Sequence, residues 1–298
     1  MSKSFLRQMK YGNEFLHNSR NWNRSRRSMM ALKKERKILP NARRIVVKIG
    51  TSSITDKRFR LDPRKIGKLV EESMRLRARG KEIIIVSSGA IGAGVGRLNL
   101  ERRPRDMSSL QAAAAVGQGV LMQVYSKYFG EYEQPAAQML LTGEDFTDPR
   151  RYRNFKNALA TLLKWGVVPI VNENDSVEVE EIRLGDNDTL SAHVAVGANA
   201  DLLVVLSDVG GLYAGYSGKG RRGRLIRTVE RVTPKVERLA GRASRGFGGM
   251  LTKVRATKIA TSAGIPVVIA NGEEEHVLER VVAGEEIGTI FLPERKKK

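Results

Sequence analysis

The sequence has no cysteine among its 298 residues and only three histidines, His17, His193 and His276. The lack of cysteine excludes disulfide bonds, thiolate metal sites and cysteine nucleophiles, and it agrees with a reducing compartment such as the cytoplasm. The histidines lie far apart and show no ligand spacing, so we expect neither a histidine metal site nor a histidine catalytic dyad. No run of about 18 apolar residues occurs, and we therefore expect no membrane-spanning helix.

Acidic residues are scarce, since 32 Asp and Glu stand against 53 Lys and Arg and give a formal net charge of +21. Residues 1–44 hold 13 of the basic residues and two Glu, and the chain ends in RKKK. Such a charge attracts polyanions, including nucleotides and nucleic acids. The basic segments lack interleaved aromatic residues and any named nucleic-acid motif. We therefore expect only non-specific nucleic-acid binding, through the basic N-terminal extension.

The chain divides into a basic extension (1–42), a domain (43–293) and a basic tail (294–298). The extension is polar, poorly periodic and rich in Arg, Asn and Ser. It can be interpreted as a disordered tail or as an organelle transit peptide. A third interpretation is that most of it is an artefact, because the true translation start is Met29 or Met30. We favour a disordered tail that has little effect on the chemistry.

Short apolar runs alternate with segments of helical periodicity from residue 44 onward. Strands are predicted at 44–50, 82–90, 136–142, 167–171, 202–208, 265–271 and 288–293. Helices are predicted at 63–79, 108–129, 151–166, 188–199, 248–264 and 274–282, and another begins within 86–94. Continuously apolar strands that alternate with helices predict an α/β fold, a three-layer αβα sandwich with a mainly parallel central sheet.

The stretch 172–188, NENDSVEVEEIRLGDND, follows a predicted strand and carries seven acidic residues in a basic protein. Taken alone, an acidic run is ordinarily a solvated loop. Its Asn and Asp side chains, however, follow the carboxyl end of a parallel strand, where open α/β sheets bind ligands. We expect residues 172–175 and 186–188 to contact a ligand, and the glutamates of 178–181 to be a solvated excursion.

Two lysines and two glycine-rich turns belong to other strand ends. Lys48 lies at the end of an apolar strand, where its charge needs a partner unless it snorkels to the sheet edge. VSSGAIGAG (86–94) and GFGGMLTK (246–253) open helices, whose N-termini favour anions, and Lys253 lies one turn inside the second helix. Neither is a Walker A motif, and each alone is compatible with a purely structural turn. Together on one sheet edge they suit phosphoryl transfer, which depends on positioning and charge neutralisation.

These segments resemble the amino acid kinase family over residues 43–293. The resemblance rests on VVKIGTSSIT, VSSGAIGAG, AVGQ, QMLLT, VPIVNENDSV, GDNDTLSA, LSDVGGLY and GGMLTK. Within the family, the NEND and GDND pair indicates the branch that phosphorylates the side-chain carboxylate of L-glutamate, the first step of proline biosynthesis. The resemblance thus implies an enzyme that uses L-glutamate and ATP with Mg²⁺, and that forms a homo-oligomer.

The resemblance also implies roles for individual residues. Lys48 and Lys253 would neutralise the transferred phosphoryl group, and Asp188, in preference to Asp186, would orient them. Glutamate would be held by Ser88, Asp175 and Asn187, with Gly89 and Asn172 beside them. ATP would contact Lys48, Ser207, Asp208, Phe247, Gly248, Gly249, Met250, Leu251, Thr252 and Lys253. Mg²⁺ would bridge phosphate oxygens of ATP, so no metal site built from protein ligands alone is expected.

Three features depart from the family pattern, and one of them is the basic extension, about which the resemblance says nothing. Phe247 stands where the nucleotide loop usually has a small polar residue, and we expect a form without the C-terminal RNA-modification-type (PUA) domain that many relatives carry. One alternative function is a kinase of the same fold that acts on another carboxylate, on carbamate or on a phosphate. A second is a basic nucleic-acid-binding protein built on this scaffold.

Overall fold

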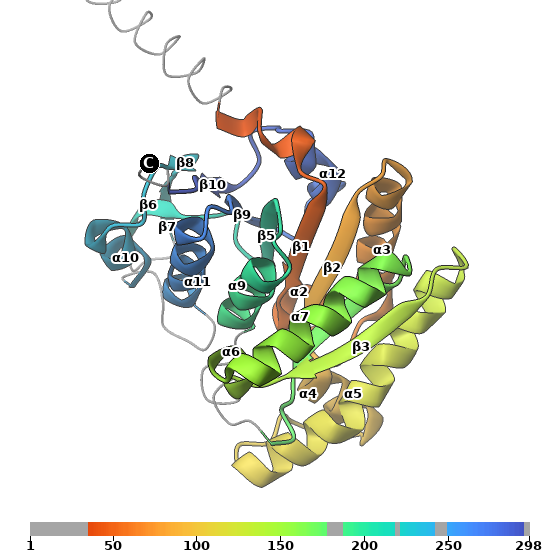
Figure 1. Ribbon diagram of the computed structural model, residues 1–298. Helices are drawn as coiled ribbons and strands as arrows, with labels where there is room; N and C mark the ends of the chain where they lie inside the picture. The colour runs from red at the N-terminus through yellow and green to blue at the C-terminus, as the bar shows by residue number, and fades with distance from the viewer. Residues whose placement is uncertain (1–34, 178–186, 218–220, 242–248, 295–298) are drawn as a thin grey trace, which may run out of the picture.

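A computed structural model describes residues 35–177, 187–217, 221–241 and 249–294. The strands of its main sheet are β1 (Arg44–Ile49), β2 (Glu82–Ser87), β3 (Ala136–Leu141), β4 (Val168–Glu173), β5 (Leu202–Ser207), β8 (Thr228–Val229), β9 (Val267–Asn271) and β10 (Thr289–Phe291). They form one eight-stranded sheet in the order β3-β4-β2-β1-β5-β9-β10-β8 (Figure 1). The strands from β3 to β9 in this order are all parallel, so their carboxyl ends meet at one edge.

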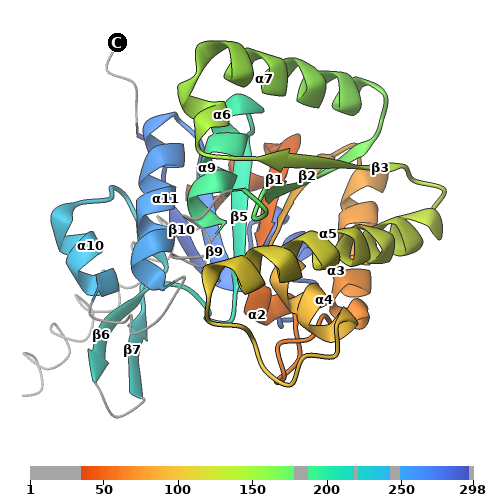
Figure 2. The same ribbon diagram turned by 90° about the horizontal axis from the view of Figure 1, so that it is seen from below.

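Helices cover both faces of this sheet (Figure 2). They are α2 (Thr51–Ile54), α3 (Pro63–Ala78), α4 (Ala90–Arg97), α5 (Met107–Gly130), α6 (Glu144–Thr147), α7 (Pro149–Lys164), α9 (Asp188–Gly197), α10 (Pro234–Gly241), α11 (Met250–Ser262) and α12 (Val277–Val282). Side chains of α3, α5 and α12 share one apolar core with the sheet, and those of α7, α9 and α11 share a second core on the opposite face. The predicted αβα sandwich is therefore confirmed. Within the described ranges, no helix is both long and apolar enough to cross a lipid bilayer.

The alternation of side chains along β1 explains how the two cores are divided. Ile45, Val47 and Ile49 are buried in the core on the α3 side, whereas Val46 belongs to the core on the α9 side. Because successive strand residues point to opposite faces, Lys48 shares its face with Val46. The strand thus directs the Lys48 side chain toward α9 and α11.

Some elements differ from those that the sequence predicts. β10 pairs antiparallel with β9, and β8 pairs parallel with β10, so both run against the rest of the sheet. Apolar periodicity carries no information on strand direction, which explains why it could not predict this reversal. A hairpin, β6 (Tyr213–Ser217) with β7 (Arg221–Leu225), lies beside the main sheet and was not predicted because its sequence is rich in Gly and Arg rather than in apolar residues. The short helices α2, α6 and α10 were also not predicted.

The packed chain begins before residue 43, where the sequence places the start of the domain. The Arg36 guanidinium donates from Nη1 to the carbonyl oxygens of Glu285 (2.7 Å) and Ile287 (2.8 Å), and from Nη2 to those of Gly288 (3.2 Å) and Arg227 (3.3 Å). Burial lowers the pKa of Arg36 to about 10. A short 3₁₀ helix, η1 (Leu39–Asn41), follows and contributes a buried leucine to the core. Residues 35–42 are therefore part of the fold, and residues 1–34 lie outside the described ranges.

Candidate active site

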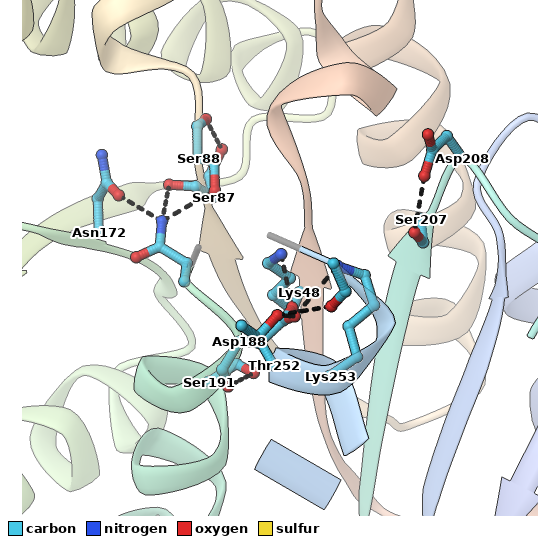
Figure 3. Close-up of polar contacts among 12 residues, drawn as sticks. Lys48, Ser87, Ser88, Asn172, Asp188, Ser191, Ser207, Asp208, Thr252 and Lys253 are labelled. Atoms are coloured by element: carbon cyan, nitrogen blue, oxygen red, sulfur yellow. Dashed lines mark hydrogen bonds and ion pairs between the residues drawn. The ribbon is translucent and has the colours of Figure 1, made fainter. Parts of the chain in front are cut away.

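Lys48, Asp188 and Lys253 converge at the carboxyl edge of the sheet, although they are far apart in sequence (Figure 3). Lys48 reaches the site from β1, Asp188 is the first residue of α9, and Lys253 lies in the first turn of α11. Lys48 Nζ is 2.6 Å from Asp188 Oδ1, and Lys253 Nζ is 3.1 Å from Asp188 Oδ2. One carboxylate therefore holds two ammonium groups in place.

The three charged groups are nearly inaccessible to water, with exposed fractions of 2% for Lys48, 0% for Asp188 and 6% for Lys253. Removing ionised groups from water is costly unless they are paired. The short distances show that both lysines are paired with Asp188. The Asp188 carboxylate also stands at the N-terminus of α9, where the helix dipole favours negative charge. Thr252 Oγ1 lies 2.7 Å from the Gly249 carbonyl oxygen and 3.2 Å from Asp188 Oδ2, which ties the start of α11 to this cluster. Two cations beside one anion make a site that favours a further anion.

A second polar network links the ends of β2 and β4 to the start of α9. Asn187 Nδ2 lies 2.8 Å from Asn172 Oδ1, 3.0 Å from Ser88 Oγ and 3.3 Å from the Ser87 carbonyl oxygen. Asn172 in turn donates from Nδ2 to Gln118 Oε1 of α5 at 2.8 Å. Asn172, Ser87 and Ser88 of this network lie close to one another in Figure 3. The network fixes the positions of side chains from two strand ends and two helices.

Asp175 lies just beyond β4 and is 7% exposed. Burial and, to a smaller extent, the Glu173 carboxylate raise the pKa of its carboxyl group to about 7, and the Arg103 guanidinium opposes this rise. Among the described residues, Asp175 Oδ1 and Asn187 Oδ1 are buried acceptors without a hydrogen-bond partner, and Gln118 Nε2 is a buried donor without one. Such groups are costly in an interior. Two buried acceptors suit a ligand that brings N–H donors.

A cleft of about 380 Å³ joins the lysine pair to Asp175 along the edge of the sheet. Its lining includes the lysine pair, Asp175, the segments 50–52 and 89–92, and Leu206, Ser207 and Asp208 at the end of β5. Ser207 Oγ donates to Asp208 Oδ1 at 3.0 Å. The cleft is therefore polar and cationic at its centre, and backbone from the turns after β1 and β2 forms part of its wall.

Gly89 allows the chain to turn from β2 into α4 at this cleft. Its φ of 105° lies in the left-handed region, which residues with a Cβ rarely adopt. A Cβ there would also approach Ile54 Cδ1 to 2.5 Å. The turn brings Ser88 within hydrogen-bonding distance of Asn187.

Two of the residues expected to contact a nucleotide direct their side chains into the core. The Met250 side chain is buried in the core on the α9 side, and Leu251 packs partly buried against the same core. Of the described residues 249–253 in this turn, Lys253 lines the cleft. Phe247, Gly248 and Asp186 lie outside the described residues, as does the acidic run 178–181.

The sequence interpretation missed two residues of the site. Arg103 lines the cleft and acts electrostatically on Asp175. It lies in the irregular segment RRPR before α5, where neither periodicity nor a motif marks it. Gln118 ends the AVGQ segment of the resemblance, and its side chain supports Asn172. Its place in the AVGQ segment and its polar side chain in an apolar, alanine-rich helix were the signals that could have found it.

The model of the amino acid kinase family matches residues 43–271, more than three quarters of the chain. The chain belongs to the amino acid kinase family. Similar members include glutamate 5-kinase from Carboxydothermus hydrogenoformans, 51% identical over 265 residues, or 88% of this chain and 71% of that protein. Glutamate 5-kinase from Clostridium acetobutylicum is 47% identical over 262 residues, or 87% of this chain and 98% of that protein.

Solved structures with a similar fold also belong to kinases. Carbamate kinase from Giardia lamblia bound to AMP-PNP has a TM-score of 0.59 at 14% identity, and the match covers 85% of this chain and 99% of that one. UMP kinase from Bacillus anthracis has a TM-score of 0.58 at 14% identity, with coverages of 85% and 97%. At this identity the likeness establishes the fold.

Proposed function

We propose that this protein is a glutamate 5-kinase, which transfers the γ-phosphoryl group of ATP to the side-chain carboxylate of L-glutamate. The product is L-glutamyl 5-phosphate, and the reaction is the first step of proline biosynthesis. Relatives of that name are about half identical over most of the chain. The single observation that carries the mechanism is the buried Lys48–Asp188–Lys253 cluster, which opens onto the cleft.

In the proposed reaction, a side-chain carboxylate oxygen of glutamate attacks the γ-phosphorus while the bond from that phosphorus to the β–γ bridging oxygen breaks. Both reactants are anionic, and charge gathers on the phosphoryl oxygens and on the departing ADP. Lys48 and Lys253 neutralise this charge, and Asp188 holds both ammonium groups in position before the substrates arrive. The glutamate carboxylate is already ionised at neutral pH, so no general base is required.

Ser88, Asn187 and Asp175 are proposed to hold glutamate. The ammonium group of glutamate can donate to the buried Asp175 Oδ1 and Asn187 Oδ1, which have no other partner among the described residues. Arg103 lines the same cleft and can meet the α-carboxylate. Asn172 and Gln118 act through Asn187, since they fix its amide by hydrogen bonds.

ATP is proposed to lie along the ends of β1, β5 and α11, against Ser207, Asp208 and the N-terminus of α11. Mg²⁺ would arrive with ATP and would supply positive charge that offsets the charge of the phosphates. In the described part of the chain, no cluster of three or more His, Cys, Asp or Glu side chains could hold a metal ion. Asp208 is the exposed carboxylate of the cleft that could bind a water of the Mg²⁺ shell.

The test is to trap the acyl phosphate with hydroxylamine. Purified protein with ATP, Mg²⁺ and L-glutamate is expected to form the γ-hydroxamate, and omission of any one of the three should abolish it. A panel of aspartate, N-acetylglutamate, carbamate and UMP, followed by ADP release, separates this activity from other kinases of the fold. ADP release with one of these acceptors and none with glutamate would overturn the proposal.

We further propose a homo-oligomer that works in the cytoplasm, where ATP and glutamate are both available. Val116 of α5 and Leu140 of the edge strand β3 are exposed apolar side chains of the kind that subunit contacts cover. Light scattering coupled to size-exclusion chromatography would test this, and a monomer at micromolar concentration would contradict it.

A further inference from the structure

Phe59 combines two features that are unfavourable for a residue of a folded protein. It is 54% exposed, and its φ of 59° lies in the left-handed region, where a residue with a Cβ is uncommon. An exposed phenyl ring adds little to stability, and the left-handed backbone conformation adds strain. Phe59 nevertheless lines the active cleft. Strained residues cluster at functional sites, so this position calls for a functional explanation.

A tight turn over residues 56–60 holds Phe59 in this conformation. Asp56 Oδ1 accepts hydrogen bonds from the backbone N–H groups of Arg58 (2.7 Å) and Arg60 (2.9 Å). The Asp56 carbonyl oxygen accepts a third hydrogen bond, from the Phe59 N–H at 3.1 Å. A β-bridge between the two residues that flank the turn closes it. The backbone of Phe59 is therefore fixed before a substrate binds.

The turn lies against α4. A Cβ on Gly92 would come within 2.6 Å of the Phe59 carbonyl oxygen, and a Cβ on Gly96 would lie 3.6 Å from Arg60 Cβ. Residues four apart lie on the same side of a helix, so these two glycines let the turn approach α4 closely. Because α4 begins just after Ser88, Phe59 belongs to the half of the cleft proposed for glutamate rather than to the half proposed for ATP.

Apolar residues accompany Phe59 in this half of the cleft. Ile91 and Val95 of α4 belong to the lining, together with the polar groups assigned to the two ends of glutamate. Asp175 and Arg103 are proposed to bind the ammonium group and the α-carboxylate, and the lysine pair faces the side-chain carboxylate. The two methylene groups between these ends are apolar, and an apolar wall is the surface that favours them.

We propose that Phe59 is a specificity-determining residue, whose ring covers the methylene groups of the acceptor and limits the space beside them. This role rests on the proposed function, because the acceptor is identified there. Covering the methylene groups removes apolar surface from water, which favours glutamate binding without changing phosphoryl transfer itself. The ring also excludes an acceptor with an extra methyl group on its chain, since one such group in an apolar site changes kcat/KM by about 10–200-fold.

The experiment compares Phe59→Asn with the parent protein in steady-state assays of ADP release. Asparagine adopts the left-handed region readily, so it keeps the turn while it removes the ring. The KM for glutamate should rise about five- to tenfold, whereas kcat and the KM for ATP should change by less than about twofold. The kcat/KM for at least one diastereomer of 4-methyl-L-glutamate, relative to that for glutamate, should rise at least about tenfold. Phe59→Tyr, which retains the ring, should behave like the parent protein.

Leu98→Ala is the matched control, because Leu98 directly follows α4, is 46% exposed and is not part of the cleft lining. It should leave all of these kinetic values unchanged. Urea unfolding separates the ring from the turn, since Phe59→Asn should unfold at the same or a higher urea concentration than the parent protein.

Two results would overturn the role of Phe59 and leave the kinase activity established. One is an unchanged KM and acceptor preference in Phe59→Asn, or an equal change in Leu98→Ala. The other is a raised KM that accompanies a loss of stability in both Phe59→Asn and Phe59→Tyr, which would assign Phe59 to the turn alone. A parent protein without glutamate-dependent ADP release would overturn the proposed function, and this role with it.

Discussion

Lys253 donates from Nζ to Asp188 Oδ2 at 3.1 Å, so the first turn of α11 is fixed to the first residue of α9. The two helices come from distant parts of the chain and share the core on one face of the sheet. The pair thus connects the segment proposed to hold glutamate with the segment proposed to hold ATP. Their relative placement is set by packing before either substrate binds.

Lys253→Met should lower kcat about 10²-fold or more, because an oriented charge at the phosphoryl group is worth a few kcal/mol in the transition state. The KM for glutamate should change much less. Lys258→Met is the matched control, since Lys258 lies further along α11, is exposed and pairs with Glu237. Steady-state assays of both variants test the prediction, and an unchanged kcat in Lys253→Met would show that this lysine does not neutralise the phosphoryl group.

The kcat/KM for glutamate should depend on pH through Asp175. Its pKa of about 7 means that the carboxylate which attracts the ammonium group of glutamate is lost as the pH falls. Below pH 7, kcat/KM should therefore fall about tenfold per pH unit, and above pH 7 it should level off. Asp175→Asn should show a low value without this slope. A profile that is the same in both proteins would rule out Asp175 as the titrating group.

Asp175→Asn should also stabilise the protein without ligands at high pH. The folded-state pKa of about 7 is above the usual value of 3.8, so the carboxyl group contributes stability below about pH 4 that is lost as the pH rises through 7. At pH 8 the variant should gain up to about 4 kcal/mol in the free energy of unfolding. Urea unfolding at pH 8 and pH 5 would measure a gain that shrinks at the lower pH. An equal difference at both values would contradict the linkage.

Two glycines two residues apart in α5 should respond in opposite ways to alanine. A Cβ on Gly117 would lie 1.8 Å from the Ala90 carbonyl oxygen, where α4 and α5 pack backbone to backbone. Gly117→Ala should therefore destabilise the protein by about 1–3 kcal/mol and displace the neighbouring Gln118. Nothing lies within 4 Å of a Cβ on Gly119, so Gly119→Ala should stabilise by up to about 1 kcal/mol. Chemical unfolding of both variants is the measurement, and a neutral Gly117→Ala would show that the helices can separate without cost.

The sequence predicted most of the fold because its strands are continuously apolar and alternate with helices. It also predicted that the segments carrying Lys48, Asp188 and Lys253 share one edge of the sheet, since parallel strands bring their carboxyl ends together, and the resemblance implied that Asp188 orients the two lysines. The distances among them depend on packing, which no local pattern contains. Arg103 was missed for this reason, because a loop arginine is recognisable as part of a site only when the fold places it beside Asp175.

The direction of β10 and the start of the packed chain are two further features that the sequence could not predict. A short apolar run is the same in a parallel and an antiparallel strand, so Thr289–Phe291 gave no sign of its reversal. Arg36 lies in a segment that is basic throughout, and its charge resembled that of its neighbours. Arg36 can be buried because its guanidinium donates hydrogen bonds to carbonyl groups some 250 positions later in the chain.

That separation has a consequence for how the protein is made. The Arg36 guanidinium is synthesised some 250 residues before its acceptors at 285–288. Until residues 285–288 have been synthesised, the Arg36 guanidinium lacks these carbonyl oxygens as hydrogen-bond acceptors. The segment that contains Arg36 and η1 therefore cannot pack in its final position. The segment around Arg36 and the segment 285–288 therefore complete their folding together, once both have been synthesised.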